Sequence, residues 1–114
     1  MSDDCIFCRI ADGRIPSRKA YEDDDLVVFH DIHPGAPVHL LVVPKEHFVN
    51  LDDAEPRHAA LLGKMLLLAP KLARDHGATN GFRVVLNNGP DGGQEVHHLH
   101  MHVMGGPRPW KRFG

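Results

Sequence analysis

Nine residues, VHHLHMHVM from Val96 to Met104, hold three histidines at alternate positions: His98, His100 and His102. Successive side chains of a β-strand point to opposite faces, so a strand here places the three imidazoles on one face. The opposite face then carries His97, Leu99, Met101 and Val103. Because the apolar residues need a covering layer, we expect a helix over that face and a polar site on the histidine face.

An apolar pattern earlier in the sequence predicts the helix that covers this face. Asp52 and Asp53 are suited to cap it, and Pro56 is tolerated in its first turn. Gly77 is expected to end it. Pro70 lies inside and removes one backbone hydrogen bond, so we expect a kink and not two separate helices. The apolar stripe of this helix consists of Leu62, Met65, Leu66, Ala69, Leu72 and Ala73.

Short apolar runs bounded by turn residues predict the other strands. The expected strands are Ala20–Glu22, Leu26–Phe29, His39–Val43, which Pro44 stops, Phe82–Leu86 and Val96–Met104. Residues 5–12 fit one or two helical turns before Gly13. The predicted fold class is therefore α+β: a five-stranded antiparallel sheet with one long helix packed on one face and a short N-terminal helix.

Size and charge narrow the class of protein. The chain has 114 residues, 42% of them hydrophobic, which suits a single domain over residues 1–114. It carries 13 basic and 15 acidic residues, so nothing suggests nucleic acid as a partner. The longest apolar run, Met65–Ala69, is far below the ~20 residues of a membrane span, and the first four residues lack the basic character of a signal peptide. We therefore expect a cytoplasmic protein with no membrane association.

Three histidines in register indicate chemistry, whereas a single histidine on a sheet is more often a surface residue. Imidazole has an ordinary pKa of about 6.5 and serves as nucleophile, proton donor or metal ligand near neutral pH. The preceding turn, NNGPDGGQ over Asn87–Gln94, offers glycine amides that can approach a phosphate. The pattern leaves open a catalytic metal held jointly by His98, His100 and His102.

Two segments resemble one known family. GGQEVHHLHMHVMGG, Gly92–Gly106, resembles the signature of the histidine triad family, His-φ-His-φ-His-φ-φ with φ apolar, in the bacterial nucleotide-binding branch. FHDIHPGAPVHLLVVPKEH, Phe29–His47, is similar to the ribose-binding strand and following loop of that family. The resemblance extends from about Cys5 to Trp110 and implies a homodimer.

The resemblance also implies roles for individual residues. His100 would attack the α-phosphorus and form a nucleotidyl-histidine that water hydrolyses. His102 would contact the phosphate and help the leaving group accept a proton, and His39 would hold His100 in its reactive tautomer. Asp31 would bind the ribose hydroxyls. Further nucleotide contacts would come from Phe29, Ile32 and Leu41 at the base, from Ile6, Phe7 and Ile10 closing that slot, and from Asn87, Gly93, Gln94 and Glu95 near the phosphate or leaving group.

Three features depart from the family pattern. His97 stands where many relatives have tyrosine; it is predicted to point away from the site and to serve packing or an interface. Glu95 stands where the animal branch has serine, and its carboxylate repels phosphate unless it accepts a proton or faces the leaving amine. The tail after Gly106 is shorter than in many relatives, where it often touches the site of the partner subunit. Glu95 and the tail bear on substrate preference.

Cys5 and Cys8 form a Cys-x-x-Cys pair. Such a pair is common in structural zinc sites, although it also fits reduced thiols or a redox pair. No βαβ unit surrounds it, which argues against a thioredoxin-like role. Zinc-containing members of the family use the positions of His47 and His98, so the resemblance completes a site of Cys5, Cys8, His47 and His98.

The functional prediction is a hydrolase of purine nucleoside phosphoramidates, of the adenosine 5′-monophosphoramidate type, that acts through a covalent nucleotidyl-histidine. It would be a homodimer with a structural Zn²⁺ and no cofactor required for catalysis. Two alternatives stay open. One is a dinucleoside polyphosphate hydrolase or nucleotidyl transferase of the same superfamily. The other is a nucleotide-binding or zinc-dependent interaction module.

Overall fold

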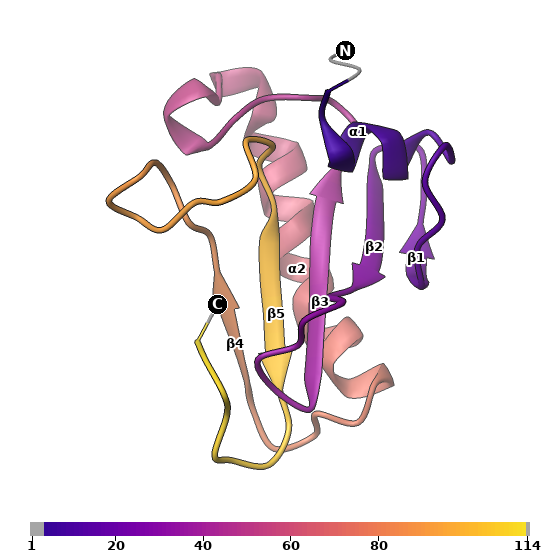
Figure 1. Ribbon diagram of the computed structural model, residues 1–114, viewed down its shortest axis with the longest axis vertical. Helices are drawn as coiled ribbons and strands as arrows, with labels where there is room; N and C mark the ends of the chain where they lie inside the picture. The colour runs from indigo at the N-terminus through magenta and orange to yellow at the C-terminus, as the bar shows by residue number, and fades with distance from the viewer. Residues whose placement is uncertain (1–3, 114) are drawn as a thin grey trace.

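The computed structural model describes residues 4–113; the first three residues, part of the N-terminus that lacks the basic character of a signal peptide, lie outside that range. Five strands form one sheet in the order β1-β2-β3-β5-β4, with every neighbouring pair antiparallel (Figure 1). The elements are α1 Ile6–Ala11, β1 Lys19–Glu22, β2 Leu26–His30, β3 Val38–Pro44, α2 Ala59–Asp75, β4 Phe82–Val85 and β5 Met101–Gly105. The predicted α+β class, with its long helix and short N-terminal helix, is confirmed.

Both faces of β2 and β3 are covered, which explains why these strands consist of continuous apolar runs. One face packs on α2, behind the sheet in Figure 1, where Leu40 and Val42 meet Met65 and Ala69. The other face packs on α1, where Phe7 and Ile10 meet apolar residues of β2 and β3. The sheet face under α1 is also the face on which the histidines of β3 and β5 lie.

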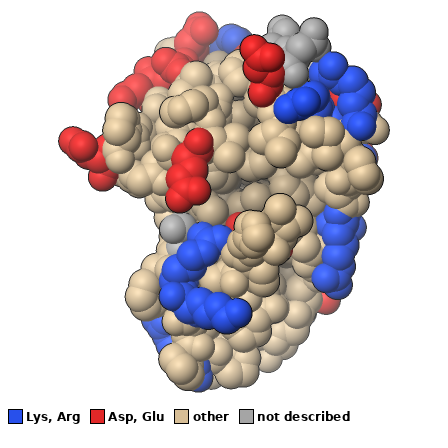
Figure 2. Space-filling view, viewed as in Figure 1, with Lys and Arg blue, Asp and Glu red and all other residues tan. Residues whose placement is uncertain are grey.

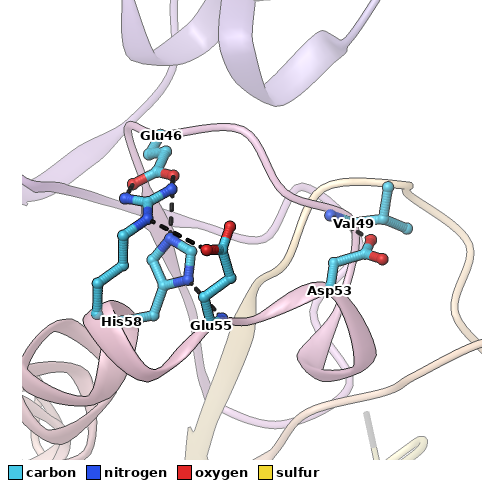
Figure 3. A network of polar contacts seen from close by, with 6 residues as sticks. Glu46, Val49, Asp53, Glu55 and His58 are labelled. Carbon is cyan, nitrogen blue, oxygen red and sulfur yellow. Dashed lines mark hydrogen bonds and ion pairs between the residues drawn. The ribbon is translucent and has the colours of Figure 1, made fainter.

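The long helix begins later than predicted. Asp52 and Asp53 lie in a separate 3-10 turn, Leu51–Asp53, and the Asp53 carboxylate accepts a hydrogen bond from the Val49 amide (Figure 3). A second 3-10 turn, Pro56–His58, leads into α2 at Ala59. The residue before a proline disfavours helical backbone angles, and Glu55 is accordingly extended. Asp52 and Asp53 therefore do not cap α2.

A buried histidine, not recognised in the sequence, connects the start of α2 to the end of β3. His58 Nδ1 accepts a hydrogen bond of 2.9 Å from the Glu55 amide, and Nε2 lies 2.9 Å from Glu46 (Figure 3). Its ring stacks on Phe48, with centroids 4.4 Å apart. Hydrogen bonds from Arg57 and His58 lower the pKa of Glu46 to about 2. The carboxylate therefore stays ionised, and this network fixes the connection that precedes α2.

The rest of α2 follows the sequence pattern with one exception. It continues without a break through Pro70 to Asp75, and Gly77 follows with a positive φ of 96°. The kink at Pro70 stays a prediction. Most of the stripe is buried or half-buried, but Leu66 is 51% exposed, because it lies about 100° around the helix from buried Met65. Within residues 4–113, no helix combines the length and the apolar character that a membrane crossing requires.

The strand expected over 96–104 forms only from Met101 onward. The register pairs Leu40 with Val103 and Val42 with Met101, so its continuation would place Leu99 opposite Pro44. Proline has no N–H to donate to the ladder, and the chain leaves the sheet at this point. The Leu99 amide instead donates to the Phe48 carbonyl at 2.8 Å. His98 and His100 consequently lie outside the strand.

Candidate functional site

A cavity of about 540 Å³ opens on the face that carries α1. Figure 2 shows this side of the molecule, with acidic side chains at the top and on the left, and basic side chains at the upper right, along the right edge and at the lower left. The structure brings most of the predicted nucleotide-binding residues together in its wall. These are Ile6, Phe7, Ile10, Phe29, Asp31, Ile32, Leu41, Asn87, Gly93, Glu95, His100 and His102.

His39 and His102 form a buried hydrogen-bonded pair beside this cavity. The Gly35 amide donates to His39 Nδ1 at 2.8 Å, so the proton of the neutral His39 ring lies on Nε2. His39 Nε2 is 2.8 Å from His102 Nδ1, so His102 Nδ1 accepts this hydrogen bond. The proton of the neutral His102 ring is therefore on its Nε2. His39 was expected to orient His100. The hydrogen bond goes to His102 instead.

His100 is oriented by the backbone two residues before it. Its Nδ1 lies 2.8 Å from the His98 carbonyl oxygen, and because a carbonyl only accepts, Nδ1 carries the proton. The lone pair of the neutral ring is then on Nε2. The ring of Phe7 packs edge-on against His100, with centroids 5.1 Å apart. This arrangement leaves one imidazole nitrogen of His100 suited to act as a nucleophile.

Burial keeps these imidazoles neutral. Loss of water lowers the pKa of His39 and of His100 below the ordinary value of 6.5. The pKa of His102 falls to about 4, first through burial and then through the neighbouring His100 and His39 rings. Neutral His100 has the lone pair that nucleophilic attack requires, so burial favours the reactive form.

Asp31 lies between the histidine pair and the outer part of the cavity. Its Oδ1 accepts from the His33 amide at 2.8 Å, and its Oδ2 lies 3.4 Å from His39 Nε2. A cation also reaches this oxygen, because Arg112 Nη2 is 3.3 Å away. Nothing in the sequence pattern pointed to Arg112 as a site residue. The carboxylate is thus oriented from several sides, with 12% of the side chain exposed.

The four residues proposed as metal ligands converge at the edge of α1. His98 Nδ1 lies 3.2 Å from Cys5 Sγ, 3.5 Å from Cys8 Sγ and 3.1 Å from His47 Nδ1. Cys8 Sγ lies 3.4 Å from His47 Nδ1. His98 Nε2 donates to the Pro44 carbonyl at 2.7 Å, which leaves the Nδ1 lone pair facing the other ligand atoms. All four ligand atoms lie within 4.8 Å of one another.

These separations match a small tetrahedral site. Zinc bonds of about 2.3 Å to sulfur and about 2.0–2.1 Å to nitrogen put tetrahedral ligand atoms about 3.3–3.8 Å apart. Two thiols and two imidazoles are also ligands that zinc accepts in closed structural sites. His98 therefore faces the cysteines, while His100 and His102 line the cavity. Joint binding of one catalytic metal by the three histidines, left open by the sequence, does not fit this division.

Comparison with known proteins places the chain in a family. The family model described as "Scavenger mRNA decapping enzyme C-term binding" matches residues 4–112. A histidine triad protein from Clostridium difficile is similar in structure, with a TM-score of 0.90 and 45% identity, covering 96% of each chain. This chain belongs to the histidine triad (HIT) family.

Other HIT proteins are similar over nearly their whole length. Protein HitA of Neisseria gonorrhoeae is 53% identical over 105 residues, covering 92% of this chain and 98% of the relative. A protein called a HIT family hydrolase, from Legionella pneumophila, has a TM-score of 0.88 and 42% identity, covering 92% of this chain and 95% of its own. The likeness thus extends over nearly the whole of this HIT chain.

Two predicted positions have a different place from the one expected. Gln94 was expected near the phosphate or the leaving group, yet it does not line the cavity, and its amide donates to the Val49 and Val96 carbonyls. Its Oε1 accepts from the Gly89 amide at 3.0 Å, so the side chain ties the glycine-rich turn together. His97 is exposed, so of the two roles expected for it, packing within the chain is excluded and an interface stays a prediction.

The buried histidines predict how the stability of this HIT chain depends on pH. The pKa of His102 is lowered in the folded state, so the unfolded chain binds more protons below pH 6.5. The free energy of unfolding that the neutral His102 ring contributes is fully present above about pH 6.5 and is lost as the pH falls towards 4. One such histidine contributes a slope of up to ~1.4 kcal/mol per pH unit. Urea unfolding at pH 5, 6 and 7 measures that slope.

We expect His102→Gln to show a shallower loss of unfolding free energy between pH 7 and pH 5 than the wild type. The matched control is His97→Gln at an exposed histidine, for which we expect the wild-type slope. An unchanged slope in His102→Gln contradicts the assignment of a neutral, buried His102.

Proposed function

We propose that this HIT chain hydrolyses purine nucleoside phosphoramidates, of the adenosine 5′-monophosphoramidate type, through a nucleotidyl-His100 intermediate. One observation carries the proposal. His100 has its proton on Nδ1, held by the His98 carbonyl, so Nε2 is the nucleophilic atom. Next to it, His102 has its proton on Nε2 because His39 occupies its Nδ1. A nucleophile and a hydrogen-bond donor are therefore neighbours in one cavity, with ring centroids 5.1 Å apart.

The reaction follows from these proton positions. His100 Nε2 attacks the α-phosphorus, and the bond from phosphorus to the leaving nitrogen breaks. His102 Nε2–H donates a hydrogen bond to that nitrogen, which takes a proton from solvent water and departs as the amine. Water then attacks the phosphorus and releases a proton to solvent, and the bond to His100 breaks to release the nucleoside monophosphate. Asp31 would bind the ribose hydroxyls, and the apolar wall around Phe29 and Leu41 would hold the base.

Glu95 supports an amine as the leaving group. Its exposed carboxylate lines the cavity, where it attracts a protonated amine and repels a polyphosphate. The dinucleoside polyphosphate alternative uses the same nucleophile but would place further negative charge near Glu95. The phosphoramidate is therefore the favoured substrate class.

His100→Asn tests the nucleophile. The asparagine keeps a polar side chain but cannot form the bond to phosphorus, so we expect turnover of adenosine 5′-monophosphoramidate to fall at least ~10³-fold, about 4 kcal/mol of barrier. Adenosine monophosphate affinity should change by less than ~10-fold, because the nucleophile contributes mainly on the way to the transition state. Single-turnover kinetics and calorimetry measure the two quantities.

An acid quench of the wild type during turnover is expected to trap the nucleotide on His100. Near-normal turnover of His100→Asn, or an adduct on another histidine, contradicts the assignment. If a diadenosine polyphosphate is turned over faster than the phosphoramidate, the alternative substrate class is correct. If neither substrate is turned over and no adduct forms, the chain is a binding module.

We further propose that Cys5, Cys8, His47 and His98 hold one structural zinc, which is not required for the chemical steps. The convergence of two thiols and two Nδ1 atoms supports this. A site with two reduced thiols also supports a reducing compartment such as the cytoplasm. The zinc would connect α1 to the end of β3 and to the segment before β5.

Cys8→Ser is expected to lower the melting temperature while leaving turnover per folded molecule largely intact, because metal held only in the folded state adds stability. Chelation should lower the melting temperature of the wild type and have little further effect on Cys8→Ser. Native mass spectrometry checks the metal content directly. Carefully purified wild-type protein without zinc contradicts the proposal.

We also propose that the chain is a homodimer, as the family resemblance implied. Leu66 and Leu67 on α2 are 51% and 82% exposed, and Phe82 on the edge strand β4 is 41% exposed. Because α2 contacts β4, these apolar side chains belong to adjoining elements and suit a second copy of the chain.

Leu67→Asp places a charge on this surface and is expected to shift the dimer towards monomer in sedimentation velocity at micromolar concentration. The matched control is Leu51→Asp, an exposed leucine outside α2 and β4, for which we expect no change of mass. A wild-type protein that sediments as a monomer contradicts the proposal.

A further inference from the structure

Arg112 reaches from the tail, Pro107–Phe113, to the carboxylate proposed to bind ribose. Its Nη2 lies 3.3 Å from Asp31 Oδ2 and donates to the His33 carbonyl at 2.6 Å. Arg112 also forms part of the cavity wall, together with His100 and His102. A cation of the chain itself therefore lies in the cavity, paired with Asp31.

Backbone contacts hold the tail in this position. The Lys111 amide donates to the Gly35 carbonyl at 2.7 Å, and the Trp110 indole donates to the Gly106 carbonyl at 3.1 Å. A Cβ at Gly35 would lie 2.5 Å from Arg112 Cγ, so glycine leaves the space that the Arg112 side chain occupies. Arg83 and Arg108 pack over the rings of Trp110 and Phe113. The contact with Asp31 thus belongs to a well-connected segment.

The contact competes with ribose. Asp31 Oδ1 already accepts from the His33 amide, and Oδ2 faces both His39 and Arg112. A ribose diol that donates to Oδ2 competes there with the Arg112 guanidinium, because both would bind the same oxygen within the cavity. Breaking the ion pair reduces the net free energy that the ribose contact contributes.

A displaced Arg112 stays close to the phosphate position. A carboxylate oxygen of Asp31 and a ring nitrogen of His102 lie within 4.8 Å of each other, and Arg112 contacts that same carboxylate. A guanidinium released here can pair with the phosphate of a nucleotide, which a nucleoside does not possess. The effect of Arg112 therefore depends on whether the ligand carries phosphate.

We propose that Arg112 is a specificity-determining residue that favours nucleotides over nucleosides, by occupying Asp31 in the unliganded chain and pairing with phosphate once ribose displaces it. The inference rests on the proposed function, in which Asp31 binds the ribose hydroxyls. Through Arg112, the tail would act on the nucleotide site of its own chain.

Calorimetric titration of Arg112→Ala with adenosine and with adenosine monophosphate tests the proposal. We expect adenosine to bind about threefold more tightly, the size expected for a partly exposed ion pair, and adenosine monophosphate to bind no more tightly than to the wild type. Salt should also strengthen adenosine binding to the wild type and not to Arg112→Ala, because screening weakens the ion pair. Unchanged or weaker adenosine binding overturns the proposal, and so does equal tightening of both ligands.

The matched control is Lys111→Ala, which removes one positive charge from the adjacent residue, outside the cavity wall, and retains the backbone contact with Gly35. We expect wild-type affinity for both ligands.

Asp31→Asn separates this proposal from the proposed function. If Asp31→Asn leaves adenosine binding unchanged, or the wild type binds neither ligand, the ribose assignment fails and this proposal fails with it. If Asp31→Asn weakens adenosine binding while Arg112→Ala has no effect, only the role of Arg112 is wrong.

Discussion

Pro44 ends β3 at the point where β5 would need a backbone N–H from it, and the chain before Met101 turns out of the sheet there. The carbonyl of Pro44 stays available and accepts from His98 Nε2, which directs His98 Nδ1 towards the cysteines. The carbonyl of His98 in turn accepts from His100 Nδ1, which leaves Nε2 of His100 unprotonated. One missing donor therefore affects both the metal-ligand cluster and the nucleophile.

Backbone groups, more than charged side chains, set the proton positions in the cavity. The Gly35 amide fixes His39, and His39 fixes His102. Burial lowers the pKa values of these rings, so each stays neutral and each has one donor and one acceptor nitrogen. Such an ordered set of donors and acceptors needs little reorganisation when a substrate binds.

The cysteine cluster and the cavity share α1. This helix has only six residues, too few to be stable alone, and its two sides have different partners. Cys8 belongs to the ligand cluster, whereas Phe7 and Ile10 line the cavity and pack on the sheet. A metal bound to Cys5 and Cys8 would hold the cavity wall in place without contacting a nucleotide. One short helix thus contributes residues to both sites.

The sequence by itself determined the features that depend on local periodicity. Apolar runs located the strands, the stripe around Met65 and Ala69 located α2, and Gly77 marked its end. Alternate histidines beside a glycine-rich turn identified the segment that forms the cavity. These signals act between residues a few positions apart, so they can be recognised without the fold.

Only the tertiary structure decided which distant groups meet. His39 and His102 are 63 residues apart, His98 and Pro44 are 54 apart, and Arg112 and Asp31 are 81 apart. The early end of β5, the partner of His39, the buried His58 and the place of Arg112 all depend on such contacts. The periodicity of the sequence predicts the face of a helix or strand on which a side chain lies. The residue that it contacts on that face depends on the packing of the whole chain.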